Sequence, residues 1–246
     1  MLKRKLDNNK NLILWNSKYY VVNDFTFELL NMFEMNLTID VIAKKIGFSK
    51  KEIKILYKEI EKNILSKDYY EYNLNLVTPI KVQWKITNKC NLNCKHCYLG
   101  KLDGFELDFK KAMGITDTII NSNVMEVTLS GGECLTYKGI EKIIQKLLNN
   151  EIKVDIFTNA LLLKTFLDKL EQRNIEKNKL LFYVSVDGLK NTHEKIRGKN
   201  TFDIIIENIK YAINKGYTIV TNTVINKINY DDIIDMVLLL KKLGVK

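Results

Sequence analysis

Hydrophobic and polar residues follow two different rhythms along the chain, and the rhythm changes at Thr78–Pro79. Before that point, two short apolar runs, Asn11–Leu14 and Tyr19–Val22, flank Asn16-Ser17-Lys18, which is typical of a β-hairpin. Segments with helical spacing follow at Phe25–Phe33, Ile39–Ile46 and Lys50–Ile64. A hairpin followed by three helices predicts a small winged-helix α+β domain over residues 1–78.

Capping residues mark the helix boundaries of this first unit. Thr38 can cap the second helix, and Gly47 is placed to end it. Ser49 and Glu52 have the spacing of a capping box at the start of the third helix. An apolar stripe predicts the buried face of that helix, formed by Ile53, Leu56, Tyr57, Ile60 and Ile64. Residues 66–77 are polar and rich in Tyr, which predicts a connector.

From Pro79 onward, apolar strands alternate with amphipathic helices. We expect strands at Ile80–Thr87, Val124–Leu129, Val154–Thr158, Leu180–Val186 and Tyr217–Val224. We expect helices at Phe109–Asn121, Gly139–Asn149, Leu162–Gln172, Phe202–Asn214 and Tyr230–Leu243. This alternation predicts a parallel sheet with right-handed crossovers, either open or closed into a barrel, over residues 79–246.

The last residues resemble the beginning of another repeat. Leu243-Gly244-Val245-Lys246 is typical of a helix end followed by the start of a strand. We therefore expect a sixth strand that is cut off, and we interpret the sequence as a fragment or a truncated reading frame.

Composition limits the class of protein. The 246 residues are 46% hydrophobic and 28% charged, which supports a packed core and argues against general disorder. The N-terminus lacks the apolar stretch of a signal peptide, and no run approaches the roughly 20 apolar residues of a membrane-spanning helix. We expect a cytoplasmic protein without a membrane partner. Its four cysteines are then expected to be reduced thiols, metal ligands or catalytic groups.

The net charge of +10 is spread over the whole chain, as expected for a solvated, Lys-rich surface. The third predicted helix is the candidate recognition helix of the winged-helix unit. It carries Lys50, Lys51, Lys54, Lys58 and Lys62, together with Glu52, Glu59 and Glu61. This helix has no Arg, the residue that makes the commonest specific contact with bases. The pattern therefore argues against nucleic-acid binding and favours capture of an extended peptide.

Three cysteines, Cys90, Cys94 and Cys97, follow the first strand of the second unit with the spacing C-x3-C-x2-C. Three thiolates on a short loop can hold three corners of a [4Fe–4S] cluster and leave one iron open. A structural zinc site needs four ligands, and His96 would have to fold back to be the fourth. A zinc site and unrelated buried thiols are the alternatives. The loop lies where active sites form in parallel β/α proteins, at the carboxyl end of a strand.

Polar motifs also end the next three strands. Ser130-Gly131-Gly132-Glu133 contains two glycines that permit close backbone approach and positive φ, followed by an anion. The third strand ends in Thr158-Asn159-Ala160 and the fourth in Ser185-Val186-Asp187-Gly188. Tight turns would explain these patterns equally well. His193 could serve in proton transfer, but we expect it to be an exposed loop residue without a role.

Together, the Cys-Asn-Leu-Asn-Cys-Lys-His-Cys-Tyr segment at 90–98 and the later motifs resemble the radical S-adenosylmethionine (SAM) enzymes over residues 80–246. The resemblance implies an α/β fold, a partial (β/α)6 TIM-like barrel, here truncated near the sixth strand. It also implies two cofactors, a [4Fe–4S] cluster on Cys90, Cys94 and Cys97, and S-adenosyl-L-methionine. The cluster of that family cleaves SAM reductively to a 5′-deoxyadenosyl radical, which abstracts hydrogen from the substrate.

The resemblance further implies which residues bind SAM. Gly131, Gly132 and Glu133 look like the motif that holds the amino group of its methionine moiety. The other residues in family-like positions are Ser185 at the ribose, Arg197 near the carboxylate, His96 near the adenine, and Asn159 and Asp187 close to the cofactor. Cys134 stands where many relatives have Pro, and we expect it to be a small packed residue. No catalytic residue can be named.

The segment from Asp187-Gly188 through His193 and Arg197-Gly198 to Thr201-Phe202-Asp203 looks most like the peptide- and protein-modifying branch, often called SPASM-type. Members of that branch often carry auxiliary clusters in a Cys-rich C-terminal extension, but no cysteine follows Cys134 here. The first unit resembles the leader-peptide recognition domain of maturases of ribosomally made peptides, which is similar to the small chaperone of pyrroloquinoline quinone biosynthesis.

The predicted function is therefore a radical SAM peptide maturase that forms a crosslink or thioether or epimerises a residue. Its expected partners are a ribosomal precursor peptide, bound by the N-terminal domain, and an electron donor such as a flavodoxin or ferredoxin. The alternatives are another radical SAM enzyme such as a sulfatase-maturing type, an iron–sulfur winged-helix sensor without turnover, and an inactive fragment.

Overall fold

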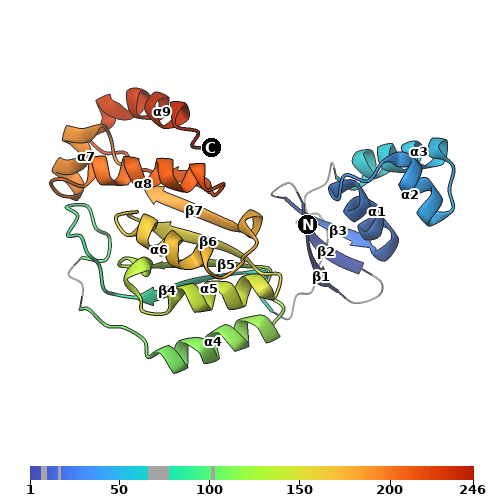
Figure 1. Ribbon diagram of the computed structural model, residues 1–246, viewed down its shortest axis with the longest axis horizontal. Helices are drawn as coiled ribbons and strands as arrows, with labels where there is room; N and C mark the ends of the chain where they lie inside the picture. Colours follow the sequence, from blue (N-terminus) through green and yellow to red (C-terminus); the bar gives the residue numbers. More distant parts are fainter. Residues whose placement is uncertain (7–9, 16–17, 66–77, 101–102) are drawn as a thin grey trace. The chain divides into compact units, whose positions relative to one another are not determined.

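A computed structural model describes residues 1–6, 10–15, 18–65, 78–100 and 103–246 (Figure 1). The chain divides into two compact units, Met1–Thr78 and Pro79–Lys246. The predicted turn at Asn16-Ser17 and the predicted connector at 66–77 lie outside the described residues.

The first unit is a three-stranded antiparallel sheet followed by three helices. The sheet order is β1–β2–β3, with β1 at Leu2–Lys5, β2 at Lys10–Trp15 and β3 at Lys18–Asn23. The helices are α1 (Asp24–Glu34), α2 (Ile39–Ile46) and α3 (Lys50–Asn63). Both predicted hairpin strands and all three predicted helices are confirmed. Strand β1 was not predicted, because its sequence Leu-Lys-Arg-Lys contains a single apolar residue.

The predicted caps of this unit form as expected. The Thr38 hydroxyl accepts a hydrogen bond from the Val41 N–H, and Gly47 ends α2 in the left-handed conformation at φ +77°. Both hydrogen bonds of the Ser49–Glu52 capping box are present. These caps satisfy backbone groups that a helix leaves unpaired at its ends. They fix where α2 and α3 begin, so that Ile53 and Ile60 of the predicted stripe are buried in the core.

The second unit contains one parallel sheet whose strands lie in chain order (Figure 1). The strands are β4 (Lys81–Thr87), β5 (Glu126–Gly131), β6 (Lys153–Thr158), β7 (Leu180–Ser185) and β8 (Thr218–Asn222). The expected helices are α4 (Phe109–Asn121), α5 (Ile140–Asn149), α6 (Leu163–Glu171), α8 (Phe202–Asn214) and α9 (Ile233–Lys242). The predicted α/β partial barrel is confirmed.

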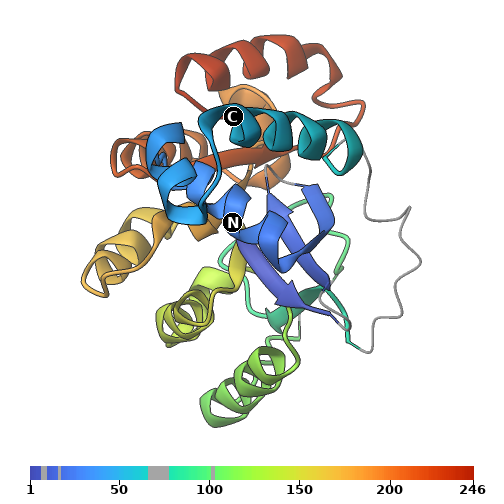
Figure 2. The ribbon, with the colours of Figure 1, turned by 90° about the vertical axis from the view of Figure 1, so that its right-hand side faces the viewer.

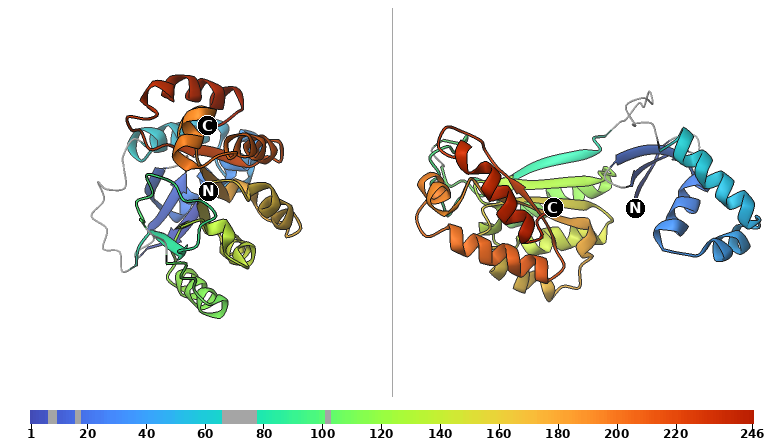
Figure 3. Two further views of the ribbon diagram at one scale, coloured as in Figure 1. Left: turned by 90° about the vertical axis from the view of Figure 1, so that its left-hand side faces the viewer. Right: turned by 90° about the horizontal axis from the view of Figure 1, so that it is seen from above.

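Four of these helices, α4, α5, α6 and α8, follow one another along the same side of the curved sheet (Figures 2 and 3). Side chains of the strands alternate between two environments because successive residues point to opposite faces. In β7, Phe182 and Val184 are fully buried, whereas Tyr183 and Ser185 are partly exposed. The buried set belongs to the apolar core, which also includes Ile143, Leu147 and Leu167 of the covering helices. The other face of the sheet remains available for a site.

The structure adds elements that the sequence did not predict. Helix α7 covers Lys190–Arg197, and short 3-10 turns occur at Cys134–Thr136, Lys177–Lys179 and Tyr230–Asp232. Helix α7 has only one apolar residue, Ile196, so it lacks the periodicity that reveals an amphipathic helix. The last predicted helix begins at Ile233, because the residues before it form the third of these 3-10 turns.

Within the described ranges, every helix is too short or too polar to cross a lipid bilayer.

Shortening a core side chain tests this packing. Leu147 of α5 is fully buried, so Leu147→Ala should lower the free energy of unfolding by about 2–5 kcal/mol. Leu238→Ala on α9 is the matched control, since that side chain is 51% exposed. Urea denaturation followed by circular dichroism measures both. Equal losses in the two variants would contradict the assignment of the core.

Candidate functional site

A hollow of about 540 Å³ opens at the carboxyl ends of the parallel strands. All predicted site residues except Asp187 line it: Cys90, Cys94, His96, Cys97, Gly131, Gly132, Glu133, Asn159, Ser185 and Arg197. Residues that the sequence did not single out, including Gln83, Phe157 and Asn222, complete the lining from the strands themselves. The fold thus brings together side chains separated by more than one hundred positions in the sequence.

The cysteine loop follows β4 without regular secondary structure, and its three thiols are half-buried. Backbone turns shape it, with the Cys97 N–H donating to the Cys94 carbonyl and the Gly100 N–H to the Cys97 carbonyl. Burial raises the pKa of the Cys90 and Cys94 thiols. A bound cation would counter this cost by stabilising the thiolates, so metal binding and thiol ionisation are coupled here.

The donor set fits an iron–sulfur cluster better than a single ion. Thiolates are soft ligands that suit iron–sulfur clusters and zinc. Across the described parts of the chain, however, no three His, Cys, Asp or Glu side chains are grouped so that they could hold one metal ion. A cubane cluster takes each thiolate on a different iron, so its ligands need not converge on one point. The imidazole of His96 lies 3.3 Å from the Asp187 carboxylate, which argues against a fourth zinc ligand at His96.

The Gly131-Gly132 pair packs directly against the backbone that leads into the cysteine loop. A Cβ at Gly131 would lie 2.4 Å from the Thr87 carbonyl oxygen, and one at Gly132 would lie 2.4 Å from that of Lys89. The Gly132 and Glu133 N–H groups donate to these two carbonyls at 2.9 and 2.8 Å. The predicted close approach is confirmed. Neither glycine has the positive φ that glycine also permits, so the lack of space for a Cβ is what requires glycine here.

Glu133 is a buried carboxylate at the edge of the hollow. It accepts hydrogen bonds from the Thr158 hydroxyl at 2.8 Å and from the N–H groups of Asn159 and Leu135 at 2.6 and 3.1 Å. Burial raises its pKa although these hydrogen bonds favour the ionised form. All three donors are neutral. The charge of Arg197 favours the carboxylate, and a cationic ligand group in the hollow would favour it further.

Asn159 connects the end of β6 with the cysteine loop. Its side-chain amide donates to the Asn91 side-chain oxygen at 2.7 Å, and its own oxygen accepts from the Leu161 N–H. The next residue, Ala160, has a left-handed φ of +60°, which favours glycine. Asn91 was missed in the sequence because it lies between two cysteines and looks like a spacer.

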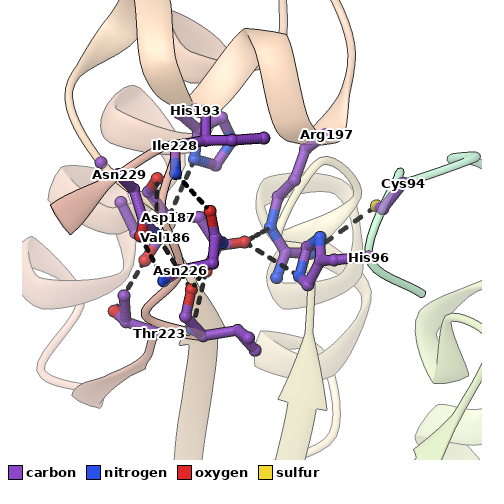
Figure 4. A network of polar contacts seen from close by, with 12 residues as sticks. Cys94, His96, Val186, Asp187, His193, Arg197, Thr223, Asn226, Ile228 and Asn229 are labelled. Atoms are coloured by element: carbon purple, nitrogen blue, oxygen red, sulfur yellow. Dashed lines mark hydrogen bonds and ion pairs between the residues drawn. The ribbon is translucent and has the colours of Figure 1, made fainter. Parts of the chain in front are cut away.

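Asp187 lies behind the hollow and holds two residues that line it (Figure 4). Its Oδ2 accepts from Arg197 Nε at 2.5 Å and lies 3.3 Å from His96 Nε2, while its Oδ1 accepts from the Val224 N–H at 2.9 Å. The carboxylate is fully buried. Asp187 does not line the hollow itself but contacts Arg197 and His96, which do, and its predicted cofactor contact stays a prediction.

Two residues of helix α7 connect this network with the cysteine loop. Arg197 Nη1 lies 3.9 Å from Cys94 Sγ, and the Lys95 N–H donates to the Ile196 carbonyl at 3.0 Å. His193 accepts a hydrogen bond from the Asp187 N–H (Figure 4), and burial lowers its pKa to about 4. The expectation of an exposed loop histidine is wrong, because the unpredicted helix α7 turns His193 into the core.

Cys134 plays a different part from the other three cysteines. It is fully buried, its thiol donates to the Phe157 carbonyl at 3.2 Å, and burial raises its pKa well above the usual value. The predicted small packed residue is confirmed.

The fold and this site define a parallel β/α barrel-like protein with three cysteines at the carboxyl ends of its strands, and comparison with known proteins gives the family. The sequence model of the radical SAM superfamily matches residues 84–240. This match spans more than half of the chain, which therefore belongs to the radical SAM superfamily. The cofactors of this superfamily are a [4Fe–4S] cluster and SAM.

Three relatives illustrate the range of similar proteins. The sporulation killing factor maturation protein SkfB of Bacillus subtilis is 27% identical over 67% of this chain and 40% of its own length. A GTP 3′,8-cyclase of Helicobacter pylori is 29% identical over 63% of this chain and 50% of its own length. The crystal structure of Streptococcus suis SuiB bound to S-adenosylmethionine matches with a TM-score of 0.63 over 99% of this chain and 62% of that chain. The two sequences are 19% identical.

The chain thus spans between 40% and 62% of the length of these relatives. The likeness to SuiB concerns the fold. SuiB has also been crystallised with its precursor peptide SuiA, and that structure matches 96% of this chain and 60% of its own, with 17% identity and a TM-score of 0.63.

A methyl group at Gly132 tests the contact between β5 and the cysteine loop. Gly132→Ala should displace the Lys89 backbone next to Cys90, because the new Cβ would overlap a carbonyl oxygen. We expect the iron content after anaerobic reconstitution to fall by about half or more. A thiolate can bind iron in a cluster only if the protein holds it within about 0.5 Å of the required position. Gly114→Ala is the control, because nothing lies within 4 Å of a Cβ there and α4 gains a better helix former. Unchanged iron content in Gly132→Ala would contradict this contact.

Proposed function

We propose that this chain carries the catalytic barrel and the peptide-binding unit of a radical SAM peptide maturase. The observation that carries the proposal is the convergence of three cysteines, a buried carboxylate and a buried guanidinium on one hollow, in a member of this superfamily. When bound, the cluster and SAM supply a 5′-deoxyadenosyl radical that abstracts hydrogen from a substrate carbon. The polypeptide binds, orients and shields these groups.

Different lining residues would bind different parts of the cluster and of SAM. Cys90, Cys94 and Cys97 would hold the cluster. Glu133 offers a buried anion for the ammonium group of the methionine moiety, and the neighbouring glycines let that group approach the backbone. Arg197 offers a guanidinium fork to its carboxylate, which suits the planar geometry of that group.

The remaining polar residues complete the SAM site. Ser185 ends β7 at the hollow, where its hydroxyl suits a ribose, and His96 offers a ring face for the adenine. Asn159 positions the loop through its hydrogen bond to Asn91. We assign Asp187 a positioning role, since its carboxylate fixes the orientations of Arg197 and His96.

The first unit supports a peptide as substrate. Strand β3 is an edge strand in the order β1–β2–β3, so an extended peptide can add to it by backbone hydrogen bonds. Helix α3 carries exposed lysines, among them Lys54 and Lys58, which suit an acidic leader segment. SkfB is named as a maturation protein and SuiB has been crystallised with a precursor peptide, which supports the same substrate class. The products we propose are a crosslink, a thioether or an epimerised residue.

The other proposed properties follow from this chemistry. A low-potential donor such as a flavodoxin or ferredoxin would reduce the cluster, and the protein would act in the cytoplasm on newly made peptides. The similarity to a GTP 3′,8-cyclase keeps a small-molecule substrate as the second candidate. Binding of a precursor peptide to the first unit separates the two candidates.

Removing one cysteine tests the cluster ligands. Cys94→Ala should reduce iron content and lower the formation of 5′-deoxyadenosine from SAM to background, measured by chromatography after reduction with dithionite. Cys134→Ala is the matched control, because that thiol packs against β6 and lies outside the hollow. It should retain both readouts. Equal activity in both variants would contradict the cysteine assignment.

Reversing charges on α3 tests peptide capture. The probes are fluorescent synthetic peptides that correspond to short reading frames beside the gene. Lys54→Glu/Lys58→Glu should weaken binding of an acidic leader by about tenfold at low salt, because attraction becomes repulsion. The control, Lys44→Glu/Lys45→Glu, makes the same charge change on exposed positions of α2. Wild-type affinity in both variants would show that α3 does not guide the peptide.

A further inference from the structure

A second hollow lies beside the cysteine loop, formed by that loop and by the helix that the sequence did not predict. It measures about 540 Å³ and is lined by Asn93, Lys95, Asn191, Glu194, Lys195, Ile196, Gly198 and Lys199. We call it the loop–α7 hollow. Asn93 lines both this hollow and the cysteine-lined one, so the two share a wall.

The loop–α7 hollow carries more positive than negative charge, with three lysines against one carboxylate in its lining. Lys95, Lys195 and Lys199 are exposed, and their side chains form no hydrogen bond or ion pair within the described residues. The one acidic lining residue, Glu194, directs its Oε1 to the Phe202 N–H at the start of α8. Other lysines of the same unit, such as Lys81, are paired with carboxylates. The unpaired set therefore produces a local positive field.

The lysines of this hollow lie next to the residues that would hold the cluster, both in the sequence and in the structure. Lys95 directly follows Cys94, and its N–H donates to the Ile196 carbonyl at 3.0 Å. Arg197, the next residue of α7, reaches Cys94 Sγ at 3.9 Å. A protein bound in the loop–α7 hollow would thus be separated from a cluster ligand by little more than the loop backbone. Short separations favour electron transfer between proteins, because its rate falls steeply with distance.

We propose that the loop–α7 hollow is the docking surface of a small acidic electron-carrier protein of the flavodoxin or ferredoxin class. The inference rests on the proposed function. One electron leaves the donor, which is oxidised, and reduces the cluster; no bond is formed or broken and no proton moves. Docking on this side of the loop leaves the cysteine-lined hollow free for SAM and substrate.

Binding of a purified bacterial flavodoxin to the reconstituted protein tests the surface directly. Lys195→Glu/Lys199→Glu should weaken this binding by about tenfold or more in low salt, measured by titration calorimetry. Lys241→Glu/Lys242→Glu makes the same change on exposed residues of α9 and should bind as the wild type does. Equal affinity in both variants would overturn the proposal. A variant that loses an acidic precursor peptide but keeps flavodoxin would also overturn it and assign the hollow to the peptide.

A second readout separates this inference from the proposed function. With reduced flavodoxin as the sole reductant, Lys195→Glu/Lys199→Glu should produce 5′-deoxyadenosine at about one-tenth of the wild-type rate. With dithionite, a small reductant that needs no docking surface, the same variant should match the wild type. Equal losses with both reductants would overturn the docking role. If the wild type itself fails with dithionite, the proposed function fails, and the calorimetric titration still decides whether the surface binds flavodoxin.

Discussion

The buried carboxylate of Asp187 organises the site of the second unit. It accepts from the guanidinium of Arg197, lies against the imidazole of His96 and receives the backbone N–H of Val224, so three separate segments meet at one group (Figure 4). A charge this deep in the protein is tolerated only when it is paired and hydrogen-bonded, and losing one partner is strongly destabilising. The position of α7 beside the cysteine loop therefore follows from satisfying this carboxylate.

The cysteine loop is held from two sides. On one side, the Gly131-Gly132 backbone presses against the carbonyls of Thr87 and Lys89 so closely that no side chain fits. On the other side, α7 supplies a backbone carbonyl to Lys95 and a guanidinium near Cys94. A loop fixed in this way can present three thiols to a cluster without a preformed single-ion site. The same arrangement gives the loop two faces, one toward the cysteine-lined hollow and one toward the loop–α7 hollow.

Much of this structure was predictable because strong local signals agree with the tertiary fold. Periodic apolar positions predicted all five strands of the parallel sheet, and capping residues such as Ser49 and Glu52 predicted where helices begin. The errors have physical causes. Strand β1 and helix α7 are mainly polar, so periodicity cannot reveal them, and their stability comes from tertiary partners. The burial of His193 depends on α7, so it was missed together with that helix.

We propose that a [4Fe–4S] cluster held by Cys90, Cys94 and Cys97 binds SAM at its open iron. Electron paramagnetic resonance of the anaerobically reconstituted and reduced protein, with and without SAM, tests this claim most directly. We expect the signal of a reduced [4Fe–4S] cluster, and we expect its shape to change when SAM is added. A protein that shows no cluster signal, or one whose signal is the same with and without SAM, would contradict it.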